Sequence, residues 1–251
     1  MSGAALVTGA GKRIGRAIAL ALADAGYDIA VHYRGARDDA DAVVAAIIAK
    51  GRRAVALSGD LANESETVAL IPAATKALGP VTCLVNNASV FERDEALTVT
   101  RESWDAHIET NLRAPFVLMQ EFARALPATQ SGAIVNLLDE RVWNLTPHFV
   151  SYTLSKAGLW TLTQTMAMAL APRIRVNAIG PGPTLPSPRQ SAEQFRRQSE
   201  SVPLHRGATP EEIAAAVCFI VSAGAMTGQM IALDGGQHLG WAQPGAGPHA
   251  E

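Results

Sequence analysis

The sequence predicts one doubly wound α/β domain built on a parallel sheet of about seven strands. The chain has 251 residues, 48% hydrophobic and 18% charged, so it can bury a sizeable core. Short aliphatic and β-branched runs alternate with longer Ala-rich stretches. Because the short runs are apolar throughout, they resemble parallel strands that helices cover on both faces.

The pattern places strands and helices in alternation. Strands are expected at 4–9, 27–33, 53–58, 81–87, 132–138, 173–180 and 229–234, and helices at 14–25, 38–50, 64–78, 101–126 and 150–171. In the first helix, apolar side chains recur at three- and four-residue steps, which is typical of a helix with one buried face. Since no internal repeat or interior linker is apparent, residues 1–240 are expected to form one domain, followed by a tail at 241–251.

A Pro-rich stretch at 180–190 follows the sixth predicted strand. Irregular connections beyond the carboxyl ends of strands often form lids or binding loops, so we expect a substrate loop at about 180–205. An ordinary surface loop is the alternative. Beyond it, Thr209, Pro210 and Glu212 form a helix start, with Thr as the N-cap and Glu three residues later.

Composition excludes several classes of protein. The formal net charge is −2 and aromatic residues make up 5%, so neither a nucleic acid nor a membrane surface is an expected partner. No apolar run approaches ~18 residues and no secretory signal is evident, which favours a soluble, cytoplasmic protein. Cys83 and Cys218 lie in apolar runs, and the six His form no ligand motif, so no metal is expected.

The first predicted strand ends in a turn at 8–15, Thr-Gly-Ala-Gly-Lys-Arg-Ile-Gly, that leads directly into a helix. Glycines let the backbone approach a pyrophosphate, while the helix N-terminus presents free N–H groups to its charge. The spacing is not GxGxxG, because one extra residue separates Gly11 from Gly15. A purely structural turn is the alternative. The expected cofactor contacts here are Gly9, Lys12, Arg13 and Ile14.

The end of the second strand indicates which cofactor is used. A free ribose 2′-hydroxyl is usually held there by Asp or Glu, but this chain has His32, Tyr33 and Arg34, with no carboxylate until Asp38. Arg34, with the cations of the glycine turn, can instead neutralise a 2′-phosphate. These residues therefore favour NADPH over NADH, solvated surface cations being the alternative.

Tyr152 and Lys156 lie four residues apart and so share one face of a predicted helix. Together with the glycine turn, Asn87-Ala88 after the fourth strand and Asn111, this pair resembles the short-chain dehydrogenase/reductase family. The resemblance covers residues 4 to about 240. It implies a Rossmann-type domain that forms dimers or tetramers through its longest helices.

The resemblance also implies catalytic roles. Tyr152 is the expected proton donor in a hydride-transfer reaction, and Lys156 is expected to bind the nicotinamide ribose and draw the phenol pKa down from ~10 towards the working pH. Asn111 is expected to hold a water chain near the Lys. The implied cofactor contacts are His32, Tyr33, Arg34, Asp60, Leu61, Asn87, Ala88, Ser89, Tyr152, Lys156, Pro181 and Gly182.

The chain departs from the family at residue 139. The family normally has a Ser 13 residues before the Tyr, and here that position is Asp139. An ionised carboxylate would repel a developing oxyanion, so ketone reduction is poorly served. A substrate with ring nitrogens fits better, and desolvation could make Asp139 itself a proton donor.

This departure resembles the pteridine reductase branch, with the related dihydromonapterin and dihydrofolate reductases. The glycine turn, the Asn-Ala-Ser-Val-Phe run at 87–91 and Gly-Pro-Gly at 180–182 resemble the same branch. The resemblance implies that Phe91 stacks on a pterin against the nicotinamide. The implied substrate contacts are Arg13, Ser89, Phe91, Asp139 and Tyr152.

The sequence therefore predicts an NADPH-dependent reductase of a dihydropterin-like or dihydrofolate-like substrate. Two alternatives remain open. One is a carbonyl reductase, such as a 3-oxoacyl carrier-protein reductase or a sugar or alcohol dehydrogenase. The other is a non-catalytic NADPH-binding sensor. Phe91 as a core residue and Asp139 as a cap or ion-pair partner of Arg141 are the corresponding structural alternatives.

Overall fold

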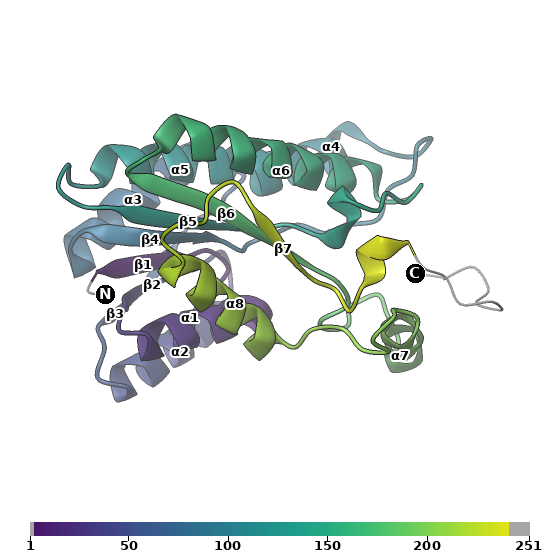
Figure 1. Cartoon of the computed structure of the whole chain (residues 1–251), viewed down its shortest axis with the longest axis horizontal. Coiled ribbons are helices and arrows are strands. Elements are labelled where there is room, and N and C mark those ends of the chain that lie inside the picture. The colour runs from purple at the N-terminus through teal and green to yellow at the C-terminus, as the bar shows by residue number, and fades with distance from the viewer. Residues whose placement is uncertain (1–2, 241–251) are drawn as a thin grey trace.

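A computed structural model describes residues 3–240, and within them the chain folds around a seven-stranded parallel sheet of order β3-β2-β1-β4-β5-β6-β7 (Figure 1). The predicted fold class is confirmed. The expected tail, 241–251, lies outside the described residues. The strands are β1 (Ala4–Val7), β2 (Asp28–Tyr33), β3 (Ala54–Ser58), β4 (Val81–Asn86), β5 (Gly132–Leu137), β6 (Ile174–Pro181) and β7 (Met230–Leu233).

Helices cover both faces of this sheet. The α-helices are α1 (Arg13–Asp24), α2 (Arg37–Ala49), α3 (Glu64–Leu78), α4 (Arg101–Ile108), α5 (Ala114–Ala125), α6 (Val150–Leu170), α7 (Ala192–Glu200) and α8 (Pro210–Ser222). Three short helices are labelled η1 (Glu109–Arg113), η2 (Glu140–Val142) and η3 (Gln237–Leu239). Every strand predicted from the sequence overlaps an observed one, with ends that differ by a few residues.

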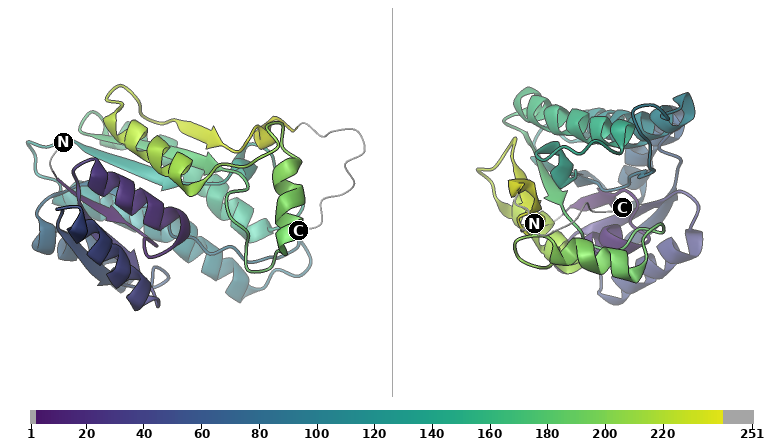
Figure 2. Two further views of the ribbon diagram at one scale, coloured as in Figure 1. Left: turned by 90° about the horizontal axis from the view of Figure 1, so that it is seen from below. Right: turned by 90° about the vertical axis from the view of Figure 1, so that its right-hand side faces the viewer.

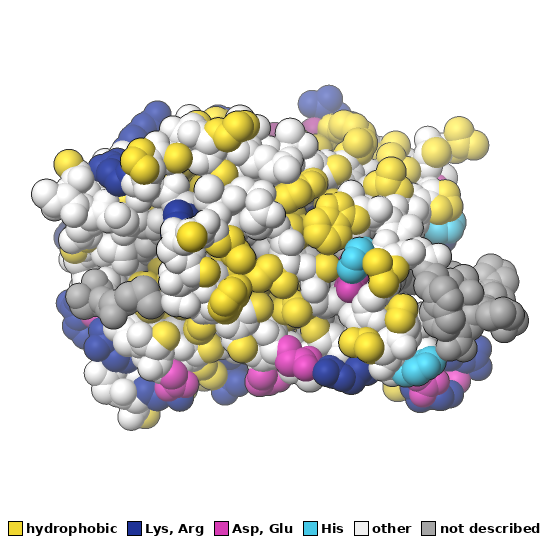
Figure 3. Space-filling view, in the orientation of Figure 1, with side chains coloured by type: hydrophobic (Ala, Val, Ile, Leu, Met, Phe, Trp, Pro, Cys, Tyr) yellow, Lys and Arg dark blue, Asp and Glu magenta, His cyan; other side chains and the backbone are white. Residues whose placement is uncertain are grey.

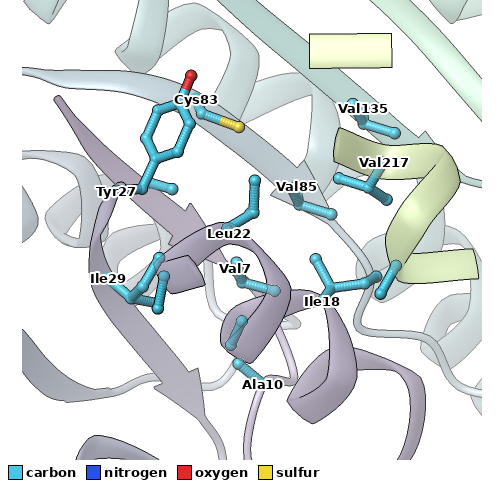
Figure 4. Packing of buried hydrophobic residues seen from close by; sticks show 14 of the residues in the cluster. Val7, Ala10, Ile18, Leu22, Tyr27, Ile29, Cys83, Val85, Val135 and Val217 are labelled. Atoms are coloured by element: carbon cyan, nitrogen blue, oxygen red, sulfur yellow. The ribbon is translucent and has the colours of Figure 1, made fainter. Parts of the chain in front are cut away.

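Each face of the sheet carries its own hydrophobic core. On one face α1, α2 and α8 pack against side chains such as Val7, Val85 and Val135 (Figure 4). On the other, α3, α5 and α6 pack around Leu6, Leu84 and Ile134. Alternate residues of each strand therefore point to opposite cores, which explains why the strands read as apolar throughout.

The strand order reverses at β1, which pairs with β2 on one side and β4 on the other. Chain connections leave β1 and β4 towards opposite faces at this point, so a crevice opens beyond their carboxyl ends. The glycine turn follows β1 and the 87–91 segment follows β4. Both predicted motifs therefore lie on the walls of one crevice.

The helix predicted at 101–126 is wrong as a single α-helix. It is divided into α4, the π-helical η1 and α5. Pro115 is the second residue of α5, and because proline has no N–H it cannot donate to the carbonyl four residues earlier, that of Asn111. The widened turn is therefore located at Asn111.

The substrate loop expected at 180–205 contains a helix that the sequence pattern did not predict. Helix α7 begins with a capping box in which Ser191 and Gln194 exchange hydrogen bonds. Figures 1 and 2 show α7 beyond the carboxyl ends of the strands. The helix start at Thr209 is confirmed, with the reciprocal Thr209–Glu212 bonds of a capping box at α8.

Candidate active site

Two adjoining clefts occupy the crevice at the carboxyl edge of the sheet. The first, about 380 Å³, lies over the glycine turn and the ends of β2 and β3. The second, about 270 Å³, lies between β5, α6 and the 182–198 segment. They share Arg13, Ile14, Asn87 and Ser89. We call them the dinucleotide cleft and the substrate cleft.

The glycine turn packs so closely against the 87–88 segment that two of its positions require glycine. Gly9 has φ +62°, a conformation that favours glycine. A Cβ on Gly15 would lie 2.2 Å from the Gly9 oxygen and 2.5 Å from Asn87 Nδ2. Thr8 Oγ1 accepts hydrogen bonds from the backbone N–H groups of Asn87 and Ala88. The α1 N-terminus is thereby fixed at the floor of the dinucleotide cleft, as phosphate binding requires.

His32 lines the dinucleotide cleft, and its buried side chain connects two segments of the cleft wall. Its Nδ1 accepts a hydrogen bond from the Gly9 N–H at 3.1 Å, so Nε2 carries the proton and donates it to the Gly59 carbonyl at 3.0 Å. Burial lowers the pKa of His32 and keeps the ring neutral. The imidazole therefore ties the glycine turn to the end of β3.

The other predicted cofactor contacts lie in three different places. Arg34, Asp60 and Leu61 line the dinucleotide cleft, as do Gly9, Lys12 and Ala88. Tyr33 is not among the lining residues of either cleft; its half-buried ring packs against the core, because alternate residues of β2 point to opposite faces. Pro181 and Gly182, at the end of β6, line the substrate cleft.

Tyr152 and Asp139 meet in the substrate cleft. The Tyr152 hydroxyl donates to Asp139 Oδ2 at 2.8 Å, and both side chains line the cleft. Asp139 also caps η2, since Oδ1 accepts from the Arg141 backbone N–H at 2.9 Å. An Asp in place of Ser thus still contacts the Tyr hydroxyl.

The expected lowering of the Tyr152 pKa is wrong for this structure. Burial, the nearby Asp139 charge and the hydrogen bond to that carboxylate raise the pKa of Tyr152 well above 10. Lys156 Nζ lies 5.8 Å from the centre of the Tyr ring and donates to the Leu137 carbonyl at 2.8 Å. Burial lowers the pKa of Lys156 to about 8, against the opposing effect of Asp139. The phenol is therefore held protonated, the form that a proton donor needs.

The Asn111 side chain forms hydrogen bonds that hold a neighbouring segment of the site in place. Its Oδ1 accepts from the Val90 N–H at 2.8 Å, and its Nδ2 donates to the Val90 carbonyl and to Ser155 Oγ. The amide is fully buried and lines neither cleft. The side chain fixes the segment that carries Ser89 and Phe91, and the water chain stays a prediction.

Phe91 lines the substrate cleft with a second ring behind it. The Phe149 ring stacks on Phe91 with centroids 4.6 Å apart and planes 14° from parallel, and Tyr152 meets Phe91 edge-on at 4.6 Å. Phe149 is buried and has φ +59°, a strained backbone for a bulky residue. The sequence patterns gave no signal for Phe149, because its contact with Phe91 is made across the fold.

Two arginines join the substrate loop to neighbouring segments of the site. Arg13 donates to the carbonyls of Leu185 and Pro186 at 3.2 and 3.0 Å. Arg189 donates to the Phe91 carbonyl at 2.7 Å and pairs with Glu92. The predicted loop therefore contacts both the glycine turn and the Phe91 segment.

Within residues 3–240, no helix is long and apolar enough to cross a membrane, and no group of three or more His, Cys, Asp and Glu is placed to hold a metal ion. Cys83 is buried and Cys218 half-buried, and both are free thiols.

Comparison with known proteins places this geometry among reductases. Residues 9–238 match the family described as Enoyl-(Acyl carrier protein) reductase. A 3-oxoacyl-[acyl-carrier-protein] reductase, FabG of Staphylococcus epidermidis, is 37% identical over 244 residues, covering 95% of this chain and 100% of that protein.

Solved structures are similar over the whole domain. FolM Alternative dihydrofolate reductase 1 from Brucella suis, in complex with NADP, has a TM-score of 0.92 and 45% identity, covering 96% of this chain and 97% of that one. A blue fluorescent protein from a metagenomic library, in complex with NADPH, has a TM-score of 0.86 and 32% identity, covering 93% of this chain and 97% of that one.

Proposed function

The chain belongs to the short-chain dehydrogenase/reductase family, and from that membership we propose that it reduces a dihydropterin-like substrate, dihydrofolate included, with NADPH. The observation that carries the proposal is the contact between the Tyr152 hydroxyl and the Asp139 carboxylate. An acid at this position suits a ring that presents N–H donors, because the carboxylate accepts them. A cytoplasmic location belongs to the same proposal.

The dinucleotide cleft fits NADPH. The close approach of Gly15 to Gly9 leaves room for a pyrophosphate at the α1 N-terminus, and Arg34 lies beside the end of β2, where a 2′-phosphate needs a cation. Lys156 would hold the nicotinamide ribose. When bound, NADPH supplies the hydride and is itself oxidised.

The substrate cleft provides a flat apolar ring and polar groups around it. Phe91 lines the cleft and is held by stacking on Phe149, so its position is preorganised for contact with a bicyclic aromatic ring. Ser89 and Asp139 lie on the same cleft and can hold the polar edge of that ring. Arg13 belongs to both clefts and can contact substrate and cofactor together.

Tyr152 supplies the proton. Its hydroxyl is buried and protonated at neutral pH, and its orientation is fixed by the hydrogen bond to Asp139. Reduction of a C=N bond places the hydride on carbon and the Tyr152 proton on nitrogen. The phenolate that remains regains its proton from solvent.

A homo-oligomer, dimer or tetramer, completes the proposal. Apolar side chains are exposed on the helices expected to pair, with Leu154 47% and Met168 75% exposed on α6. Figure 3 shows further hydrophobic side chains over β7 and α8, where Phe219 is 54% exposed. A second copy covering these helix faces would bury them.

A carbonyl reductase is the second candidate, favoured by the 37% identity to the Staphylococcus epidermidis 3-oxoacyl-[acyl-carrier-protein] reductase. The Tyr152–Lys156 pair serves either reaction. The Asp139 carboxylate at the Tyr152 hydroxyl distinguishes the two reactions. Its negative charge would repel the oxyanion that develops when a ketone is reduced.

A panel of substrates tests the proposal. Purified protein is mixed with NADPH and dihydrobiopterin, dihydromonapterin, dihydrofolate or an acetoacetyl thioester, and NADPH absorbance is followed. We expect turnover of at least one dihydropterin or dihydrofolate, with an antifolate competing. Consumption of NADPH with the thioester alone would establish the carbonyl reductase instead.

A further inference from the structure

Arg141 is a buried cation in the wall of the substrate cleft. Its side chain is 9% exposed, and Nη1 lies 3.3 and 3.5 Å from the two carboxylate oxygens of Asp139. Its backbone N–H also donates to Asp139 Oδ1. Both the backbone N–H and the guanidinium of Arg141 therefore contact the carboxylate that accepts the hydrogen bond from the Tyr152 hydroxyl.

The guanidinium also reaches the aromatic platform. Its central carbon lies 5.6 Å from the centre of the Phe91 ring and 5.3 Å from that of Phe149. Cation–π contacts at these distances help to hold a planar cation in place. Arg141 thus links the carboxylate to the ring surface on which the proposed substrate lies.

The groups facing Asp139 show what this cation does. Tyr152 and Lys156 approach from α6, and Glu140 and Arg141 belong to η2. Tyr152 donates a hydrogen bond but no charge, and Lys156 Nζ is engaged with the Leu137 carbonyl. Glu140 adds negative charge. Arg141 is the cation in direct contact with the carboxylate among these groups.

We propose that Arg141 is a positioning residue that keeps Asp139 an ionised acceptor, so that the cleft selects N–H donors and Tyr152 alone gives the proton. This inference rests on the proposed function for its substrate class. It assigns Asp139 the acceptor role and leaves the donation of the proton to Tyr152. Without the guanidinium, a mostly buried carboxylate would take up a proton to avoid its desolvation cost.

The test uses Arg141→Met and Arg141→Lys in the full chain, read first by infrared spectroscopy of the carboxyl groups near pH 7 without substrate. We expect a new protonated-carboxyl band in Arg141→Met that disappears in the Arg141→Met, Asp139→Asn double variant. Arg141→Lys keeps the charge and should show no such band. Arg101→Met, which removes an exposed guanidinium from the exposed Asp105, is the matched control and should show none.

Kinetics provide the second reading. In Arg141→Met, KM for the dihydropterin should rise about tenfold or more, whereas Arg141→Lys should stay close to the wild type. If Arg141→Met does not fold, Arg141→Gln gives the same comparison, because it keeps hydrogen-bonding groups and loses the charge.

The inference would be overturned if Arg141→Met, or Arg141→Gln, showed no new protonated-carboxyl band. It would also be overturned if the band remained after Asp139→Asn was added. The infrared result needs no substrate. Failure of the proposed function would therefore appear in the substrate panel, and failure of the Arg141 role would appear in the spectra.

Discussion

The two clefts are built in different ways. The dinucleotide cleft is organised around a glycine turn after β1, which the buried His32 ties to the end of β3. The substrate cleft is made from side chains of segments far apart in sequence, including 89–91, 137–141, 152–156 and 182–198. The first can be recognised from a short motif. The aromatic contacts of the second have no such local motif.

Left-handed backbone occurs in both regions. In the glycine turn the left-handed backbone at Gly9 costs little, because glycine tolerates it. At Phe149 the same region of φ is occupied by a bulky residue, held by a hydrogen bond from its N–H to the Asp94 carbonyl at 2.9 Å. Arg13, within the glycine turn, has φ +52°, so each region holds one non-glycine residue in this conformation.

The largest expected effect is a loss of turnover caused by a change in the substrate cleft alone. Tyr152→Phe removes the proton donor and should lower kcat by about 10²–10⁴ on every accepted substrate, the usual contribution of a general acid. NADPH affinity, measured by fluorescence titration, should stay within about twofold. Tyr33→Phe, whose ring packs outside both clefts, is the control and should change neither quantity. Unchanged turnover in Tyr152→Phe would favour the non-catalytic sensor.

The next largest expected effect is a loss of NADPH affinity caused by a change in the dinucleotide cleft alone. Gly15→Ala places a Cβ 2.2 Å from the Gly9 oxygen, so the turn must shift. We expect the NADPH Kd to rise by at least about tenfold, equivalent to roughly 1.4 kcal/mol. Gly224→Ala, where a Cβ would meet nothing within 4 Å, is the matched control. Equal Kd values for the two variants would mean that the turn does not hold the cofactor.

The smallest effect is a pH dependence that links the two sides. Because burial lowers the pKa of Lys156 to about 8, its ammonium loses its proton as pH rises through that value. NADPH affinity should therefore fall several-fold between pH 7 and 9. Lys156→Met should bind NADPH more weakly at pH 7 and lack this fall. A fall of the same size in Lys156→Met would assign the pH dependence to another group.

The sequence predicted the sheet and most helices because apolar periodicity reports burial directly. It failed at 101–126, where amphipathic periodicity continues through Pro115 although proline cannot complete the α-helical ladder. It also missed α7, because that helix has no buried residues and the Pro-rich approach obscured its Ser191 cap. Polar, exposed helices leave little hydrophobic signal.

In the candidate site, too, local sequence patterns could be predicted and contacts between distant segments could not. The Gly9 turn and the Tyr152–Lys156 pair could be predicted, since each is a local spacing with a local consequence. The stack of Phe149 on Phe91 and the contact of Arg141 with the Phe91 ring could not, because 58 and 50 residues separate the partners in the sequence. The raised pKa of Tyr152 likewise depends on burial, which spacing does not give.

Asp139→Ser tests the central claim most directly, because it restores the hydroxyl that the family normally has beside the Tyr. The measurement is the ratio of kcat/KM for a dihydropterin to that for an acetoacetyl thioester, in wild type and variant. The account predicts that the ratio falls by about 10²-fold or more, through weaker dihydropterin reduction and a gain of ketone activity. An unchanged ratio, or a variant that reduces the dihydropterin better than the wild type does, would contradict it.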